Sequence, residues 1–147
     1  MTTLLLSHPA CLDHLTPQGH PERPDRLRAI ERVLEQEKFQ GLVREQAPMA
    51  TPETIALAHP MDYVQHVRDA APREGMVRID ADTTMSPGSF EAVMRAAGGA
   101  ALAVDEVMTG KAANAFVATR PPGHHAETAT AMGFCLSKRM HRVLVVP

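Results

Sequence analysis

Two adjacent histidines, His124 and His125, are the residues of this chain best suited to chemistry. They stand in the run RPPGHHA at residues 120–126, where two prolines fix the backbone and Gly123 permits close approach. An aromatic residue, Phe134, follows in the run MGFCL. One neutral imidazole deprotonates an attacking water while the other stabilises developing charge or protonates a leaving amine. The pattern favours a hydrolysis, and the alternative that the pair only decorates a surface turn stays open.

Amide cleavage by two imidazoles needs a further group. The tetrahedral oxyanion requires an oxyanion hole or a Lewis-acid metal, and zinc both activates water and stabilises that oxyanion. We therefore expect the missing partner of the pair to be a metal site. The other histidines show no ligand spacing and are interpreted as loop, cap or packing residues: His8, His14, His20, His59, His66 and His141.

The two cysteines give no metal or disulfide signal. Cys11 and Cys135 lie far apart in the sequence and form no CxxC pair. Neither a disulfide framework nor a cysteine zinc site is indicated. Cys135 is interpreted as a small buried residue and not as a nucleophile, because nothing near it marks a thiolate.

The elements that position the histidine pair follow from hydrophobic periodicity. Short apolar runs predict strands at residues 3–6, 42–45, 115–118 and 143–146, and the third of these is expected to be buried. Apolar residues at helical spacing and proline starts predict helices at residues 24–34, 52–57, 61–69 and 88–110. The segments between them at residues 7–21 and 72–87 are polar and rich in glycine or proline, and they are predicted to be loops.

Strands that alternate with helices predict an α/β fold with a parallel sheet. Sites in such sheets form beyond the carboxyl ends of the strands. The histidine loop follows the predicted strand at residues 115–118, so it lies at such an end.

Composition excludes several classes of function. A chain of 147 residues is about one domain, and its formal charge of -2, without a run of lysine or arginine, does not favour nucleic acid as a partner. No basic leader precedes the short run Leu4-Leu5-Leu6, and no stretch approaches the ~20 apolar residues of a spanning helix. We expect a cytoplasmic protein that does not enter membranes.

Four motifs occur in order along the chain: HPERPDRL at residues 20–27, SPGSFEA at 86–92, RPPGHHA at 120–126 and MGFCL at 132–136. This set resembles the zinc-dependent histone deacetylase superfamily, and most of all its branch of bacterial and class II-like deacetylases, acetylpolyamine amidohydrolases and acetoin-utilisation proteins. The resemblance covers nearly the whole chain. It implies a partial arginase/deacetylase-like fold, with a parallel sheet flanked by helices, in one incomplete domain at residues 1–147.

The resemblance also implies roles for individual residues. His125 matches the general base of the family, and His124 matches its partner imidazole. Phe134 and Gly133 match residues that shape the narrow acyl-lysine channel. Arg23 resembles an arginine at the inner end of that pocket, although a salt bridge at a helix terminus is an equally good interpretation of Arg23.

The chain departs from the family pattern in three respects. The family places an Asp-x-Asp-x-His segment with zinc ligands after a strand like residues 143–146, and this chain does not. The family's catalytic tyrosine lies farther on, and Tyr63 is in the wrong region to replace it. Residues 137–147 depart as well, because the connection after Leu136 is too short for a parallel crossover. We expect a chain truncated before the zinc-ligand segment, with no metal ligands of its own and no bound zinc.

The resemblance implies the N-terminal fragment of an amidohydrolase that removes acetyl groups from acetyl-lysine peptides or acetylated polyamines, inactive alone. Two alternatives remain. One is a non-catalytic module that binds acylated amines or assembles with a partner. The other is half of a split enzyme that a complementing chain completes, and self-association through an exposed sheet edge is also expected.

Overall fold

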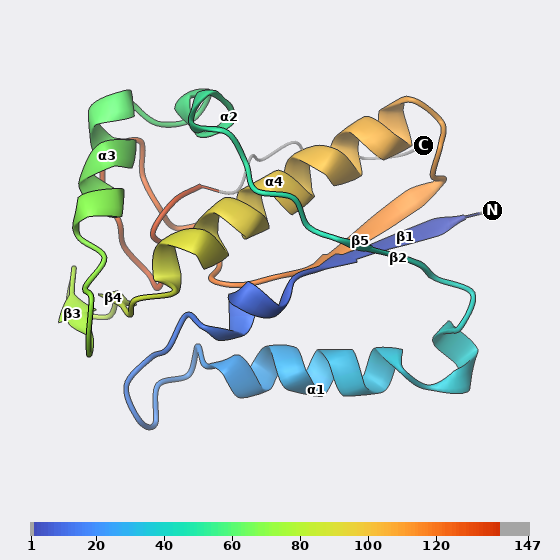
Figure 1. The fold of residues 1–147 in the computed structure, drawn as a ribbon, viewed down its shortest axis with the longest axis horizontal. Helices are drawn as coiled ribbons and strands as arrows, with labels where there is room; N and C mark the ends of the chain where they lie inside the picture. The colour runs from blue at the N-terminus through green and yellow to red at the C-terminus, as the bar shows by residue number, and fades with distance from the viewer. Residues whose placement is uncertain (1, 139–147) are drawn as a thin grey trace.

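A three-stranded parallel sheet lies between helices in the computed structural model, which describes residues 2–138 (Figure 1). The strands β1 (Thr3–Ser7), β2 (Val43–Gln46) and β5 (Asn114–Ala118) stand in the order β2-β1-β5. In the register, Leu5 of β1 pairs with Arg44 of β2 and with Phe116 of β5. The prediction of an α/β fold with a parallel sheet is confirmed.

Both faces of the central strand are covered, which explains why β1 is a continuous apolar run. Leu5 packs against α1 (Pro24–Leu34) through Leu27 and Leu34. Leu4 and Leu6 point to the other face, where α4 (Ser89–Met108) lies. Figure 1 shows α1 and α4 on opposite sides of the sheet.

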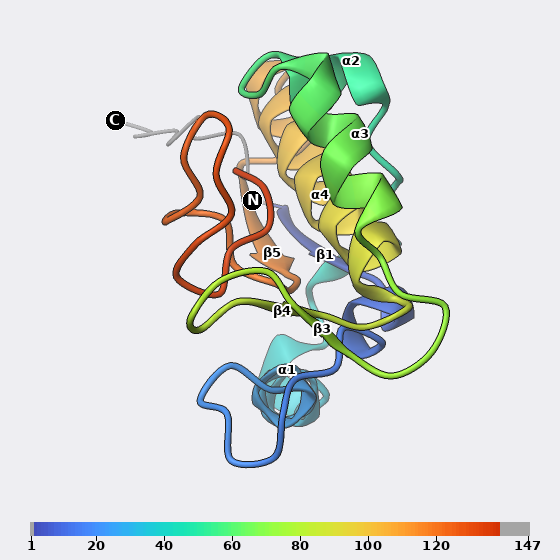
Figure 2. The ribbon, with the colours of Figure 1, turned by 90° about the vertical axis from the view of Figure 1, so that its left-hand side faces the viewer.

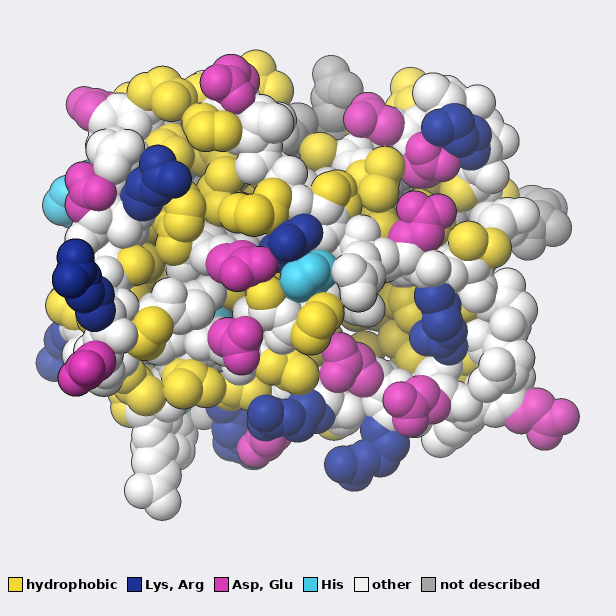
Figure 3. Space-filling view, in the orientation of Figure 1, with side chains coloured by type: hydrophobic (Ala, Val, Ile, Leu, Met, Phe, Trp, Pro, Cys, Tyr) yellow, Lys and Arg dark blue, Asp and Glu magenta, His cyan; other side chains and the backbone are white. Residues whose placement is uncertain are grey.

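A second layer covers the outer side of α4. The short helices α2 (Pro52–Ala56) and α3 (Met61–Asp69) pack there through Ile55 and Val64 against Met94. Figure 3 shows hydrophobic side chains gathered over this part of the surface. Within residues 2–138, no helix is both long and apolar enough to span a membrane.

The chain between β2 and α2 crosses α4 at very close range. A Cβ built on Gly98 would lie 2.1 Å from the carbonyl oxygen of Pro48 and 2.6 Å from the nitrogen of Ala50. Next to this point the amide of Ala50 donates a hydrogen bond to the carbonyl oxygen of Met94 at 2.9 Å. The small residues at the centre of α4 therefore set the distance between the two layers.

Most predicted elements are confirmed, and three details are corrected. The predicted loop at residues 7–21 contains a 3-10 helix, η1 (Pro9–Leu12), because the ring of His8 caps it by accepting from the amide of Ala10 at 3.2 Å. A second 3-10 helix, η2 (Glu37–Phe39), follows α1. The predicted connection at residues 72–87 contains the antiparallel strands β3 (Val77–Arg78) and β4 (Thr84–Met85).

A further correction concerns β5, a strand predicted to be buried. Phe116 is 47% exposed, because β5 is an outer strand of the described sheet. The predicted strand at residues 143–146 lies outside the described residues. Of the tail at 137–147, only residues 137 and 138 lie within them.

The carboxyl ends of β1 and β5 point to the same side of the molecule. Figure 2 views that side, with the loop at residues 119–138 next to α3 and the β3–β4 hairpin, and with the start of α1 below. The predicted position of the histidine loop beyond the end of a parallel strand is confirmed.

Candidate active site

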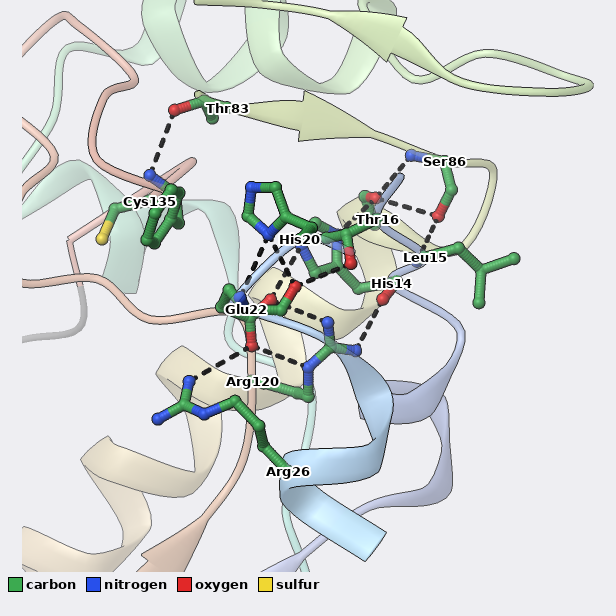
Figure 4. Close-up of polar contacts among 12 residues, drawn as sticks. His14, Leu15, Thr16, His20, Glu22, Arg26, Thr83, Ser86, Arg120 and Cys135 are labelled. Carbon is green, nitrogen blue, oxygen red and sulfur yellow. Dashed lines mark hydrogen bonds and ion pairs between the residues drawn. The ribbon is translucent and has the colours of Figure 1, made fainter. Parts of the chain in front are cut away.

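A buried ion pair between Glu22 and Arg120 joins the loop after β1 to the loop after β5 (Figure 4). The guanidinium donates to both carboxylate oxygens, at 2.9 Å from Nε and 2.7 Å from Nη2. The two residues are only 3% and 2% exposed. Two parallel hydrogen bonds in this fork geometry fix the relative orientation of both side chains.

Arg120 also satisfies backbone carbonyls of the loop between β1 and α1. Its Nη1 donates to the carbonyl oxygens of Cys11 at 2.9 Å and His14 at 2.6 Å. On the opposite side of the carboxylate, Nη1 of Arg26 lies 3.8 Å from Glu22 Oε1. The buried side chain of Arg120 therefore contacts the loop after β1 at three positions along its length.

His14 extends this network to the start of α4. Its Nδ1 lies 2.7 Å from Ser89 Oγ, and its Nε2 lies 3.6 Å from Glu22 Oε2. Ser89 Oγ accepts from the amide of Ser86 at 2.7 Å. Burial and the charge of Arg120 lower the pKa of His14 while Glu22 opposes the shift, and the resulting pKa is about 4. His14 is therefore neutral near pH 7, with its ring set by hydrogen bonding.

The histidine pair projects from this fixed base. The ring centroids of His124 and His125 are 4.0 Å apart, and the ring planes are tilted by 52°. Both side chains are exposed, whereas the flanking Gly123 and Ala126 are buried. The loop thus anchors its backbone and leaves the two imidazoles accessible, which is what proton transfer to a substrate needs.

The run MGFCL folds back against the pair. A Cβ built on Gly133, whose φ is +58°, would lie 2.6 Å from the Cβ of His125. The amide of His125 donates to the sulfur of Cys135 at 3.4 Å. Cys135 is fully buried, as predicted.

Phe134 follows Gly133 in the same turn, and its ring packs against another residue, His20. Phe134 adopts an unusual positive φ of 68°, and its amide donates to Thr83 Oγ1 at 3.2 Å. The ring packs edge-on against His20, with centroids 4.7 Å apart. A bulky residue rarely adopts this backbone conformation, and such strain is typical of functional positions.

Arg23 does not join the other predicted site residues. Its side chain is exposed and lies 3.9 Å from Asp25 in a weak ion pair at the start of α1. Arg26, one turn later, approaches the buried Glu22 instead. The geometry agrees with the helix-terminus interpretation of Arg23, and its assignment to a substrate channel stays a prediction.

Sequence reasoning missed the roles of Glu22, Arg120 and His14, although all three lie in or beside its motifs. Arg120 comes two residues after the end of β5. A charged residue so close to the end of a strand indicates that it has a buried partner. No pattern in the sequence could name that partner.

A metal ion does not fit the part of the chain that the structure describes. Residues 2–138 contain no group of three or more His, Cys, Asp or Glu side chains placed to hold one. A zinc site normally uses three or four such ligands.

Residues 20–141 match the family described as the histone deacetylase domain. Because this match covers most of the chain, the chain belongs to the histone deacetylase family. The family predicted from the motifs is confirmed. Deacetylases of this family generally depend on zinc.

Relatives and a solved structure agree with this assignment. The chain is 35% identical over 118 residues to "Histone deacetylase-like amidohydrolase" of Pseudomonas aeruginosa, covering 80% of this chain and 31% of that protein. It is 32% identical over 149 residues to "Polyamine deacetylase HDAC10" of Homo sapiens, covering 88% of this chain and 22% of the relative. The crystal structure of the HDA15 HD domain superposes with a TM-score of 0.88 at 32% identity, covering 94% of this chain and 40% of that one.

The chain thus spans less than half the length of each of these three proteins. The expected partial deacetylase-like fold is confirmed by the structural match. The expected relation to part of a deacetylase is also confirmed.

Removing the charge of Glu22 should destabilise the protein strongly. The substitution Glu22→Gln leaves the buried guanidinium of Arg120 without its counter-charge, and we expect a loss of about 3 kcal/mol or more in the free energy of unfolding. Urea denaturation measures this loss. The matched control is Asp25→Asn, which removes the exposed pair with Arg28 and should cost less than ~1 kcal/mol. Equal losses of unfolding free energy in the two variants would contradict the larger effect expected for the buried pair.

The buried neutral His14 should make stability depend on pH. Because the folded pKa of about 4 lies below the ordinary 6.5, the unfolded chain binds a proton in this window that the folded chain does not. The free energy of unfolding should therefore decrease as pH falls from 6.5 towards 4, by up to about 1.4 kcal/mol per pH unit. Urea titrations at several pH values measure the slope. His14→Gln should show a shallower slope, and an unchanged slope would refute this origin.

An added methyl group at Gly133 should displace His125. Gly133→Ala and Gly75→Ala both put a side chain at positive φ, at +58° and +68°, so each should lose roughly 1 kcal/mol of stability. Only Gly133→Ala also forces a clash with the ring of His125, since nothing lies within 4 Å of a Cβ on Gly75. We expect the imidazole signals of His125 in NMR spectra to move in the first variant only. Identical spectra around His125 in both variants would rule out the close contact.

Proposed function

We propose that this chain provides the proton-transfer part of a hydrolase that deacetylates acetyl-lysine peptides or acetylated polyamines. The observation that carries the proposal is the exposed imidazole pair, with a centroid separation of 4.0 Å, between the buried residues Gly123 and Ala126. Family membership gives the class of reaction, and the relatives' names include a histone-type and a polyamine deacetylase. The choice between these two substrates stays open.

In this proposal His125 takes the proton of the attacking water. A neutral ring nitrogen accepts that proton, and the partner ring of His124 supplies electrostatic help to the charge that develops on the substrate. Proton return to the leaving amine follows from the same pair. Gly133 lets His125 sit against the loop, and Phe134 forms an apolar wall for the methylene chain of an acylated amine.

The described residues do not complete this site. Amide hydrolysis also needs a group that stabilises the oxyanion, and residues 2–138 do not hold a metal cluster for that purpose. We therefore assign to these residues the positioning and transfer of protons, and we expect no hydrolysis by them alone. A non-catalytic module that binds acylated amines is the second candidate, because the Phe134 wall and the hollow lined by His124 and His125 need no metal to contact a ligand.

The purified chain should not hydrolyse an acetyl-lysine peptide or an acetylated polyamine, with or without added zinc. The reason is that residues 2–138 hold no metal cluster to stabilise the oxyanion. Release of acetate is the measurement, and the Pseudomonas aeruginosa relative serves as the positive control. Acetate release by this chain that a chelator abolishes would overturn the expectation of inactivity.

Calorimetric titration of the same ligands separates the two candidates. Heat of binding without hydrolysis favours a binding module. No heat at millimolar ligand removes that candidate and leaves the incomplete hydrolase. His124→Ala and His125→Ala are the variants to compare in either case.

A further inference from the structure

His59 lies under the histidine loop and contacts it at two points. The residue precedes α3, is 3% exposed and is 69 residues away in sequence from its nearer partner, Thr128. Its Nδ1 lies 2.7 Å from the carbonyl oxygen of Thr128, and its Nε2 lies 2.8 Å from the amide nitrogen of Lys138. One ring thus bridges two separate parts of the loop.

The two partners fix the protonation state of the ring. A carbonyl oxygen only accepts and an amide only donates, so Nδ1 must carry the proton and Nε2 must be bare. Burial lowers the pKa of His59; the hydrogen bond to Thr128 opposes this shift, and the ammonium group of Lys138 adds to it. The neutral form therefore fits the site, and a proton on Nε2 would point at the amide proton of Lys138.

Tyr63 supports the same contact from one helical turn farther on. Its ring stacks on His59 at 4.9 Å, and its hydroxyl donates to the carbonyl oxygen of Leu136 at 2.8 Å. Burial raises the pKa of Tyr63 to about 12, so the hydroxyl stays protonated and keeps donating. Of the two rings, His59 is the one whose charge changes as the pH falls below neutral.

The bridged residues line the hollow next to the histidine pair. Thr128 and Lys138 stand on its wall together with His124 and His125. We infer that His59 is a positioning residue, whose neutral ring holds the two parts of the loop together and whose protonation releases the Lys138 part. This inference rests on the proposed function only in treating His124 and His125 as the proton-transfer groups.

Amide hydrogen exchange at Lys138, followed by NMR from pH 5 to 7.5, tests the inference directly. In the unmodified chain, the protection factor of this amide should fall roughly fivefold to tenfold as His59 becomes protonated, because its acceptor is lost. The amide of Leu6 in β1 is the internal reference for global unfolding. A Lys138 protection factor that stays constant while the ring of His59 titrates would overturn the inference.

Two substitutions separate positioning from simple structural support. His59→Gln places a carbonyl oxygen near the position of Nε2 and should keep the Lys138 amide protected at every pH. His59→Asn reaches only the position of Nδ1, so the amide should be unprotected throughout, and the ring signals of His124 and His125 should move. The exposed His66 of α3 gives the control. His66→Asn should change neither the protection of the Lys138 amide nor the ring signals.

Unchanged protection and unchanged ring signals in His59→Asn would also contradict the inference. If His59→Asn does not fold, the pH series on the unmodified chain still decides. Exchange does not require hydrolysis, so the test stands even if acetylated amines prove not to be substrates. Failure of the proposed function would instead appear in the acetate and calorimetry measurements, with the behaviour of Lys138 intact.

Discussion

The buried ion pair of Arg120 with Glu22 is the contact on which the rest of the site depends. It joins the loop after β5 to the loop after β1. The same guanidinium donates hydrogen bonds to two carbonyl oxygens of the loop after β1. Taking both charges out of water costs about as much as their attraction returns, so the pair adds little net stability. Its effect is selective, because any other course of these loops would leave a buried charge unpaired.

The loop at residues 119–138 replaces sheet pairing with side-chain hydrogen bonds. A long loop without strands must still satisfy its buried backbone groups. Here the partners come from two regions: Thr83 just before β4, and His59 and Tyr63 around the start of α3. Because each anchor holds backbone, the imidazoles themselves remain exposed. Rigidity and accessibility, which usually conflict in a loop, are combined in this way.

Sequence reasoning predicted the elements with strong periodicity and missed those without it. The helix α4 carries a long apolar pattern and β1 a short continuous apolar run, so their position and type followed directly. The strands of the β3–β4 hairpin have two residues each, too few to show alternation. Residue types and motif order predicted the histidine pair, but the contact of Glu22 with Arg120 spans 98 residues and no local pattern encodes it. The same holds for His59.

The size of each catalytic effect decides what the imidazole pair can contribute. General acid–base catalysis typically accelerates a reaction by about 10²- to 10⁴-fold. Enzymes typically reach about 10⁶-fold or more, and electrostatic stabilisation of the transition state is usually the largest single contribution. In the proposed function, His124 and His125 therefore supply part of the rate acceleration of a deacetylase and not all of it. Residues 2–138 show no metal cluster to supply the rest. In the proposed function this part of the chain positions the proton-transfer groups, and amide hydrolysis also needs a group that stabilises the oxyanion.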